Sequence, residues 1–98
     1  MIARIWRGVI RATDVDEYVR YIEDTGIKEY KQTPGNRGAW MLTRVDGERA
    51  EVVTLSFWES YAAIEGFAGA DIEKAVYYPE DDRFLLERTD KVLHYEIA

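Results

Sequence analysis

The chain has 98 residues, 47% of them hydrophobic and 33% charged, a composition that predicts one folded domain over residues 1–98 and excludes a disordered chain. Thirteen basic residues against nineteen acidic ones give a net charge of −6, which argues against a nucleic-acid partner. The lack of cysteine excludes disulfides and thiolate metal sites, and because no apolar run approaches the ~20 residues that span a bilayer, we expect a cytoplasmic protein without a membrane partner.

A strand followed by a helix is predicted at the start of the chain. Residues 2–11 are rich in β-branched and aromatic side chains, and both faces of this strand are largely apolar. Asp14, with Glu17 three residues later, has the spacing of a capping box at a helix N-terminus. Apolar residues at helical spacing then predict about four turns that end at or near Gly26: Val15, Tyr18, Val19 and Ile22.

Two strands joined by a tight hairpin are predicted next. Residues 39–45 form the first of these strands, and Arg49–Trp58 form the second. Asp46 and Gly47 between them predict a two-residue type I′ turn, which needs a positive φ at both positions.

The rest of the chain predicts a second helix, a connection and a last strand. Ser60 is the expected N-cap of the helix, and Asp71 starts a further short helix that Pro79 ends. An acidic connection over residues 80–90 leads to the last strand, residues 91–97.

The order strand-helix-strand-strand-helix-strand predicts an α+β, ferredoxin-like fold, with a four-stranded antiparallel sheet and both helices on one face. Two helices cover only one side of such a sheet, yet the third strand carries apolar side chains on both sides: Val53, Leu55 and Phe57 on one, and Val52 and Trp58 on the other. An uncovered apolar face of this size is unfavourable in water. We therefore expect a homodimer in which two sheets face each other; the alternative is that residues 80–90 fold over the bare face.

Three adjacent carboxylates, Glu80, Asp81 and Asp82, are the one sequence feature that could hold a hard cation. They lack the spacing of a calcium-binding loop, so a solvated acidic loop is the favoured interpretation. No metal site is expected.

The motif Trp58-Glu59-Ser60 leads from the third strand into the second helix. It lies within a longer pattern, which consists of residues 51–63, Phe67, residues 75–78 and residues 92–96. This pattern resembles the antibiotic biosynthesis monooxygenase family and covers nearly the whole chain. The resemblance implies a homodimer that closes into a dimeric α/β barrel, with a pocket between sheet and helices for a flat aromatic substrate and no cofactor.

Two groups of enzymes in that superfamily carry different residues from this chain at defined positions. The quinone-forming oxygenases have an asparagine where this chain has Thr54 and a tyrosine where it has Ile64. The haem-degrading branch has an asparagine, a tryptophan and a histidine ligand where an ungapped comparison places Arg7, Phe67 and Tyr77. Tyrosine ligates iron in some haem proteins, but the three departures together make haem breakdown the least favoured function.

Trp58 and His94 are the candidate catalytic residues. The resemblance suggests that the Trp58 ring forms a pocket wall and that its N–H donates to a bound oxygen; the alternative is a core aromatic. His94 is the only side chain with an ordinary pKa near neutrality, which suits a general base that deprotonates a phenol; the alternative is a hydrogen-bonded or surface histidine.

The expected substrate-binding residues combine two arginines with several aromatic side chains. Arg4 and Arg7 project to opposite faces of the first strand, so at most one of them points into the cleft. There it would stabilise a substrate oxyanion, unless a carboxylate neutralises it in a structural ion pair. The aromatic candidates for the pocket wall are Trp6, Phe67, Tyr77 and Tyr78.

We therefore expect a cofactor-independent monooxygenase that acts on a small, flat, aromatic, polyketide-like substrate. A non-catalytic ligand-binding or accessory protein with the same pocket is the first alternative, and haem binding or degradation is the second. The expected partners are a second copy of the chain and a small hydrophobic or aromatic molecule.

Overall fold

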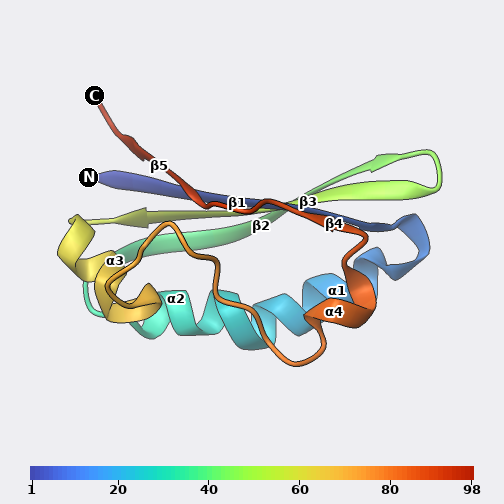
Figure 1. Ribbon diagram of the computed structural model, residues 1–98, viewed down its shortest axis with the longest axis horizontal. Coiled ribbons are helices and arrows are strands. Elements are labelled where there is room, and N and C mark those ends of the chain that lie inside the picture. The colour runs from blue at the N-terminus through green and yellow to red at the C-terminus, as the bar shows by residue number, and fades with distance from the viewer.

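The computed structural model describes all 98 residues, and its sheet has the predicted topology (Figure 1). The strand order is β2-β3-β1, and β4 and β5 both pair with the remaining edge of β1; every pairing is antiparallel. This confirms the α+β, ferredoxin-like fold. The strands are β1 (Ile2–Arg11), β2 (Asn36–Asp46), β3 (Arg49–Trp58), β4 (Glu87–Arg88) and β5 (Leu93–Glu96).

The last predicted strand, residues 91–97, is confirmed in a shorter form as β5, and a further short strand, β4, lies in the predicted connection; a detour of the chain separates the two. The Thr89 amide still donates to the carbonyl of Arg7 in β1, at 3.0 Å. The Val92 amide instead donates to the carbonyl of Glu73, outside the sheet, at 2.8 Å. Because Val92 bonds to another segment, the ladder along β1 is interrupted, and the segment around Glu73 is held beside the sheet.

One long helical run covers a single face of the sheet. It consists of α1 (Val15–Ile22), a π-helical turn (Glu23–Ile27) and α2 (Lys28–Gln32). The helix is therefore longer than predicted, and Gly26 lies inside it rather than at its end. The predicted capping box is wrong, because Asp14 has helical φ and ψ angles within a preceding 3₁₀ turn and its side chain makes no capping bond.

The hairpin between β2 and β3 has two loop residues, as predicted, but they are Gly47 and Glu48. Asp46 pairs with Arg49 in the ladder, and Gly47 alone has a positive φ, of 63°. This is the φ pattern of a type II′ turn, in which glycine occupies the first position. The type I′ prediction was therefore one residue out of register.

The second predicted helix is confirmed, and the short helix predicted from Asp71 is not formed. In α3 (Tyr61–Ala68), the Ser60 hydroxyl accepts a bond from the Ala63 amide at 3.1 Å, and the helix ends at Gly69, whose φ is +83°. Residues 69–80 then contain no helix or strand, only turns at residues 72–73 and 79–80. This segment, which we name the crossing segment, runs over the space between the sheet and the long helix (Figure 1).

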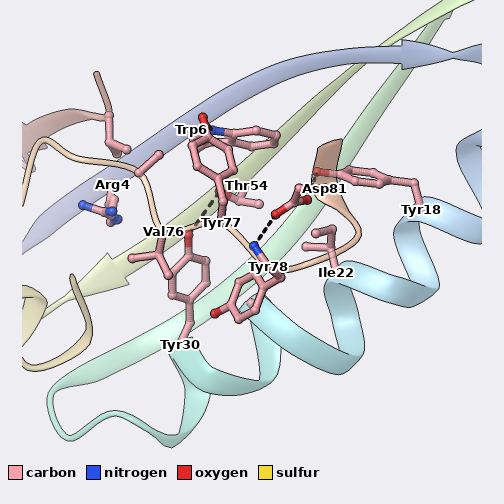
Figure 2. A pocket seen from close by; sticks show the side chains of 13 residues that line it. Arg4, Trp6, Tyr18, Ile22, Tyr30, Thr54, Val76, Tyr77, Tyr78 and Asp81 are labelled. Carbon is pink, nitrogen blue, oxygen red and sulfur yellow. Dashed lines mark hydrogen bonds between the residues drawn. The ribbon is translucent and has the colours of Figure 1, made fainter. Parts of the chain in front are cut away.

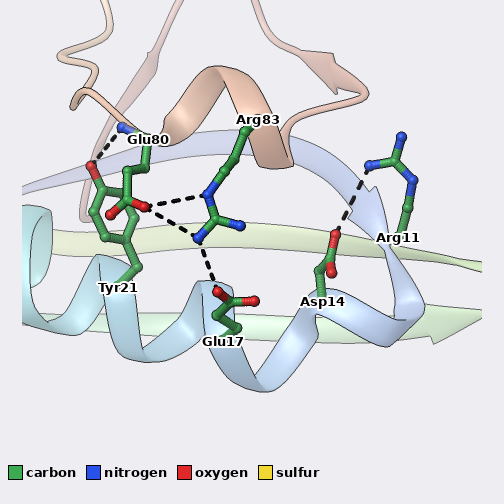
Figure 3. Close-up of polar contacts among 6 residues, drawn as sticks. All are labelled: Arg11, Asp14, Glu17, Tyr21, Glu80 and Arg83. Atoms are coloured by element: carbon green, nitrogen blue, oxygen red, sulfur yellow. Dashed lines mark hydrogen bonds and ion pairs between the residues drawn. The ribbon is translucent and has the colours of Figure 1, made fainter.

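A last short helix, α4 (Asp81–Phe84), packs on the helix layer rather than on the bare face of the sheet. Phe84 is buried, with its ring centroid 5.1 Å from that of Tyr18 in α1. Arg83 reaches Glu17 at 2.9 Å, and the Glu80 amide donates to the Tyr21 hydroxyl at 3.0 Å (Figure 3). The alternative that residues 80–90 cover the bare face is therefore wrong.

The other face of the sheet carries no covering element (Figure 1). Strand alternation places Arg4, Trp6 and their neighbours against the helices, and places the intervening residues on what we name the open face. Several large apolar side chains there are about half exposed: Trp40 (49%), Leu42 (47%), Leu93 (53%) and Tyr95 (54%). No helix in the structure is both long enough and apolar enough to cross a membrane.

Candidate functional site

A narrow pocket lies between the sheet and the long helix, beneath the crossing segment (Figure 2). Its walls come from β1, β3, α1, α2, the crossing segment and α4, and most of its lining is apolar or aromatic. Only about 30 Å³ is open to the centre of a water molecule, room for a few waters. The polar and aromatic residues that line it are Arg4, Trp6, Tyr18, Tyr30, Thr54, Tyr77, Tyr78 and Asp81.

Arg4 provides a buried positive charge at one end of the pocket. It is 1% exposed, and no carboxylate lies within ion-pair distance of its guanidinium. Its Nη1 donates to the Ile72 carbonyl at 2.6 Å, while its Nε has no partner at all. Burial lowers the pKa of Arg4, and the neighbouring Tyr30 opposes this. Arg4 therefore forms no structural ion pair, and its Nε donor remains unused.

His94 lies beside Arg4 and outside the pocket lining. Its Nε2 is 2.9 Å from Arg4 Nη1, and because an arginine can only donate, Nε2 accepts. Burial lowers the pKa of His94, and the positive charge of Arg4 lowers it further. His94 is thus held neutral with its lone pair directed at Arg4, where it orients the guanidinium.

Asp81 provides a buried carboxyl group at the opposite end of the pocket (Figure 2). It is 2% exposed and accepts two hydrogen bonds, one from the Tyr18 hydroxyl at 3.1 Å and one from the Tyr78 amide at 2.7 Å. Burial raises the pKa of Asp81, and these two donors, with the nearby Arg88, oppose that shift. The solvated-loop interpretation is therefore wrong for Asp81, because α4 packs this residue inward.

An aromatic pair forms one wall between the two charged ends. The Trp6 ring N–H donates to the Tyr77 hydroxyl at 3.2 Å, and the rings meet edge to face. The absence of a side chain at Gly8 makes room for the indole, since a Cβ there would lie 2.7 Å from the Trp6 ring. The Tyr78 hydroxyl donates to Glu29 on α2. Trp6, Tyr77 and Tyr78 thus line the pocket.

Trp58 and Phe67 lie behind the pocket instead of lining it. Trp58 is fully buried, and its ring N–H donates to the Ser56 hydroxyl at 2.9 Å. Phe67 packs on Tyr30 with ring centroids 4.4 Å apart, and the Arg4 guanidinium carbon lies 5.9 Å from the centre of the Phe67 ring. Both aromatics therefore support pocket residues from the rear.

Arg7 does not line this pocket. As an odd-numbered residue of β1 it projects onto the open face, where it pairs with Glu51. The acidic run is likewise divided, since Asp82 pairs with Arg88 and Glu80 with Arg83, both at the surface. No group of three or more potential ligating side chains that could hold a metal ion is present.

Four polar pocket residues were not recognised as site residues in the sequence: Tyr18, Tyr30, Thr54 and Asp81. Tyr18 belongs to the predicted apolar stripe of the helix, and Tyr30 lies beyond the predicted helix end. The signal that could have found Thr54 is alternation along β3, which places it opposite Trp6 on the helix side. Nothing local distinguishes Asp81 from Asp82.

Comparison with solved structures identifies the same fold in proteins of diverse description. MhuD, a heme-degrader from Mycobacterium tuberculosis whose structure has two hemes bound in its active site, is 19% identical, with a TM-score of 0.67 and coverage of 99% of this chain and 95% of that one. An uncharacterized NIPSNAP domain protein from Burkholderia xenovorans is 22% identical, with a TM-score of 0.64 and coverage of 100% and 95%. An antibiotic biosynthesis monooxygenase is 17% identical, with a TM-score of 0.61 and coverage of 100% and 99%.

No family model and no curated protein sequence matches the chain. These structural similarities extend over the whole chain and establish its fold, although each sequence identity is below 25%. They include a structure of the antibiotic biosynthesis monooxygenase family that the sequence resembles. The chain therefore has the ferredoxin-like α+β fold found in an antibiotic biosynthesis monooxygenase and in a heme-degrader.

Proposed function

We propose that the protein is a homodimeric, cofactor-independent monooxygenase whose small, flat, aromatic substrate binds in the pocket between the sheet and the long helix. The observation that carries this proposal is Arg4. A buried cation without a carboxylate partner is unfavourable unless a ligand supplies negative charge. Here Arg4 lines an aromatic pocket, and its buried Nε has no hydrogen-bond partner.

The proposed chemistry begins when the substrate, a phenol or its keto tautomer, loses a proton. Arg4 stabilises the resulting oxyanion, which is electron-rich enough to transfer an electron to dioxygen. In the complete reaction a ring CH₂ group becomes a carbonyl: one atom of O₂ enters the product, and the other leaves as water with the two hydrogens. Dioxygen is the only co-reactant.

The pocket must widen before such a substrate can enter. Sites for small organic ligands usually enclose about 300–1,000 Å³, far more than the roughly 30 Å³ open to water centres here. Packing on the sheet holds the long helix, and strand pairing holds the sheet together, whereas the crossing segment has no regular structure of its own. We therefore assign the opening movement to the part of the crossing segment that follows Glu73 and carries Tyr77 and Tyr78.

His94 and Trp58 receive supporting roles in this proposal. The lone pair of His94 already accepts from Arg4, so His94 holds the guanidinium in place rather than serving as the free general base. The Trp58 ring N–H is bonded to Ser56, so Trp58 fixes the wall behind Tyr30. Both roles act through other residues.

The homodimer is proposed from the open face. A second copy placed sheet against sheet would remove from water the half-exposed side chains of Trp40, Leu42, Leu93 and Tyr95. Light scattering at micromolar concentration should give about twice the 11.4 kDa of the chain. Leu93→Glu should give the monomer, whereas Val45→Glu, which is similarly exposed but on the other side of the sheet, should not. A monomeric wild type would contradict the dimer.

Oxygen uptake tests the catalytic proposal. An oxygen electrode should record consumption of one O₂ per molecule of an anthrone-like substrate, without added flavin or metal. Arg4→Met should lower the rate, and Arg20→Met, at an exposed arginine on α1, is the matched control that should not. Absence of uptake across a panel of such compounds would contradict catalysis.

A non-catalytic ligand-binding protein is the second candidate. It is favoured by one observation: the two residues expected to be catalytic already use their functional groups within the protein. Ligands that raise the melting temperature without turnover would support it. Haem is not proposed, because the hydroxyl of Tyr77, the candidate iron ligand, already accepts from Trp6 and donates to the Thr89 carbonyl.

A further inference from the structure

Asp81 is the second buried charged group in the pocket lining, and nothing in the pocket neutralises it. It lies at the start of α4, at the end of the pocket opposite Arg4, and the two residues form no ion pair (Figure 2). Its chain neighbours Glu80 and Asp82 are exposed and paired with arginines. Of the three acidic residues, only Asp81 faces the pocket.

Two hydrogen bonds fix the orientation of this carboxylate and leave part of it unused. Tyr18 donates to one oxygen at 3.1 Å and the Tyr78 amide donates to the other at 2.7 Å. An ionised carboxylate offers about four acceptor positions, so these two bonds leave acceptor capacity on a residue that lines the pocket. A purely structural acceptor for the Tyr78 amide needs no charge, since an asparagine oxygen would serve equally.

We propose that Asp81 is the proton acceptor of the reaction, and that the pocket selects ring compounds in which an acidic C–H or O–H lies across the ring from an oxygen held by Arg4. The inference rests on the proposed function and names the substrate geometry that this function requires. Its basis is the placement of one buried carboxylate and one buried guanidinium at opposite ends of a single aromatic pocket.

The proton-transfer step is redox-neutral and balanced. The substrate C–H or O–H bond breaks, its proton bonds to a free Asp81 oxygen, and its electron pair stays on the substrate. In a conjugated ring that pair delocalises onto the oxygen at the far side, where Arg4 Nε provides a hydrogen bond. Burial favours the reaction further, because it raises the pKa of Asp81 and makes it a stronger base than an exposed aspartate.

Deuterium exchange without oxygen isolates this step. An anthrone is incubated anaerobically with the protein in D₂O, and the loss of its acidic CH₂ signal is followed by proton NMR. The wild type should accelerate exchange over buffer, and Asp81→Asn should lower the accelerated rate by about 100-fold or more, the usual contribution of a positioned base. Anthrone affinity, from tryptophan quenching, should change less than threefold. Asp82→Asn makes the same substitution at an exposed neighbour and should retain full exchange.

Each outcome decides one of the two claims. Exchange at the wild-type rate in Asp81→Asn, or no acceleration by the wild type, overturns the role of Asp81. Exchange that depends on Asp81 without oxygen uptake retains that role and refutes the monooxygenase. Oxygen uptake at the wild-type rate in Asp81→Asn supports the monooxygenase and refutes the role of Asp81.

A pH profile serves if Asp81→Asn fails to fold. The charged and titratable groups around Asp81 are Tyr18 from α1, Arg88 from β4 and Asp82 from α4 itself, with the Tyr78 amide from the crossing segment. Tyr18→Phe removes a bond that stabilises the ionised carboxylate, so the acid limb of the exchange profile should move to higher pH. An unshifted limb would overturn the proposal, since a structural role for Asp81 would leave the limb in place.

Discussion

Replacing Arg4 with methionine should separate a functional arginine from a structural one. The substitution removes two bonds made by Nη1, to the Ile72 carbonyl at 2.6 Å and to His94 at 2.9 Å. Hydrogen bonds of charged groups each contribute about 1.5–3 kcal/mol. The same substitution also removes the unpartnered Nε, whose burial costs about 1–3 kcal/mol, and the several kcal/mol of burying a cation.

These contributions nearly offset each other, because no carboxylate is left unpaired when Arg4 is removed. We expect the free energy of unfolding of Arg4→Met to lie within about 1.5 kcal/mol of wild type, or above it. Loss of one arm of a buried ion pair would instead cost about 3–5 kcal/mol. Ligand affinity should behave differently, and fall about 10- to 150-fold for an anionic ligand, the equivalent of 1.5–3 kcal/mol.

Urea unfolding followed by tryptophan fluorescence measures the first quantity, at one fixed protein concentration because a dimer unfolds with concentration-dependent stability. Arg20→Met, on the exposed side of α1, is the matched surface control. If Arg4→Met lowered the free energy of unfolding by 3 kcal/mol or more, Arg4 would be structural and the argument for an anionic ligand would fail.

Three further substitutions test the surroundings of the pocket. Gly8→Ala should destabilise the fold by about 1–3 kcal/mol, because the new methyl group lies 2.7 Å from the Trp6 ring; unchanged tryptophan fluorescence and stability would contradict this packing. His94→Gln should flatten the rise in stability that the wild type shows as the pH increases towards about 7. Burial and Arg4 lower the folded-state pKa of His94, so below the unfolded value of ~6.5 the unfolded state binds the extra proton and stability falls. A curve parallel to that of wild type would contradict the His94–Arg4 contact. Trp58→Phe should cost about 1–3 kcal/mol in urea while turnover per folded molecule stays within a few-fold, and a loss of turnover without loss of stability would restore a direct catalytic role for Trp58.

Alternation along strands is the part of the structure that the sequence predicts best. The rule that successive side chains project to opposite faces limited the cleft to one of Arg4 and Arg7, and the structure identifies Arg4. The same rule predicted an apolar open face. Both inferences depend only on a period of two residues, which local sequence specifies.

The residues that were missed depend on contacts between distant segments. Tyr30 reaches the pocket because the helix continues through a π-helical turn past Gly26, a feature that propensity does not indicate. Gly26 lies beside the Tyr78 ring, and a Cβ at that position would be in ordinary van der Waals contact with the ring, at 3.4 Å. Asp81 is buried only because Phe84 docks α4 on Tyr18, and this long-range packing distinguishes it from the adjacent Asp82.

The central claim is that Arg4 binds an anionic oxygen inside the pocket, and the ionisation of a coloured phenol tests it most directly. A hydroxyanthraquinone is titrated with the protein at a pH about one unit below its own pKa in water, and the phenolate absorption band is recorded. We predict that wild-type protein raises the phenolate fraction of the bound dye and that Arg4→Met does not. Binding of the dye as the neutral phenol by both proteins, or the same phenolate fraction in both, would contradict the account.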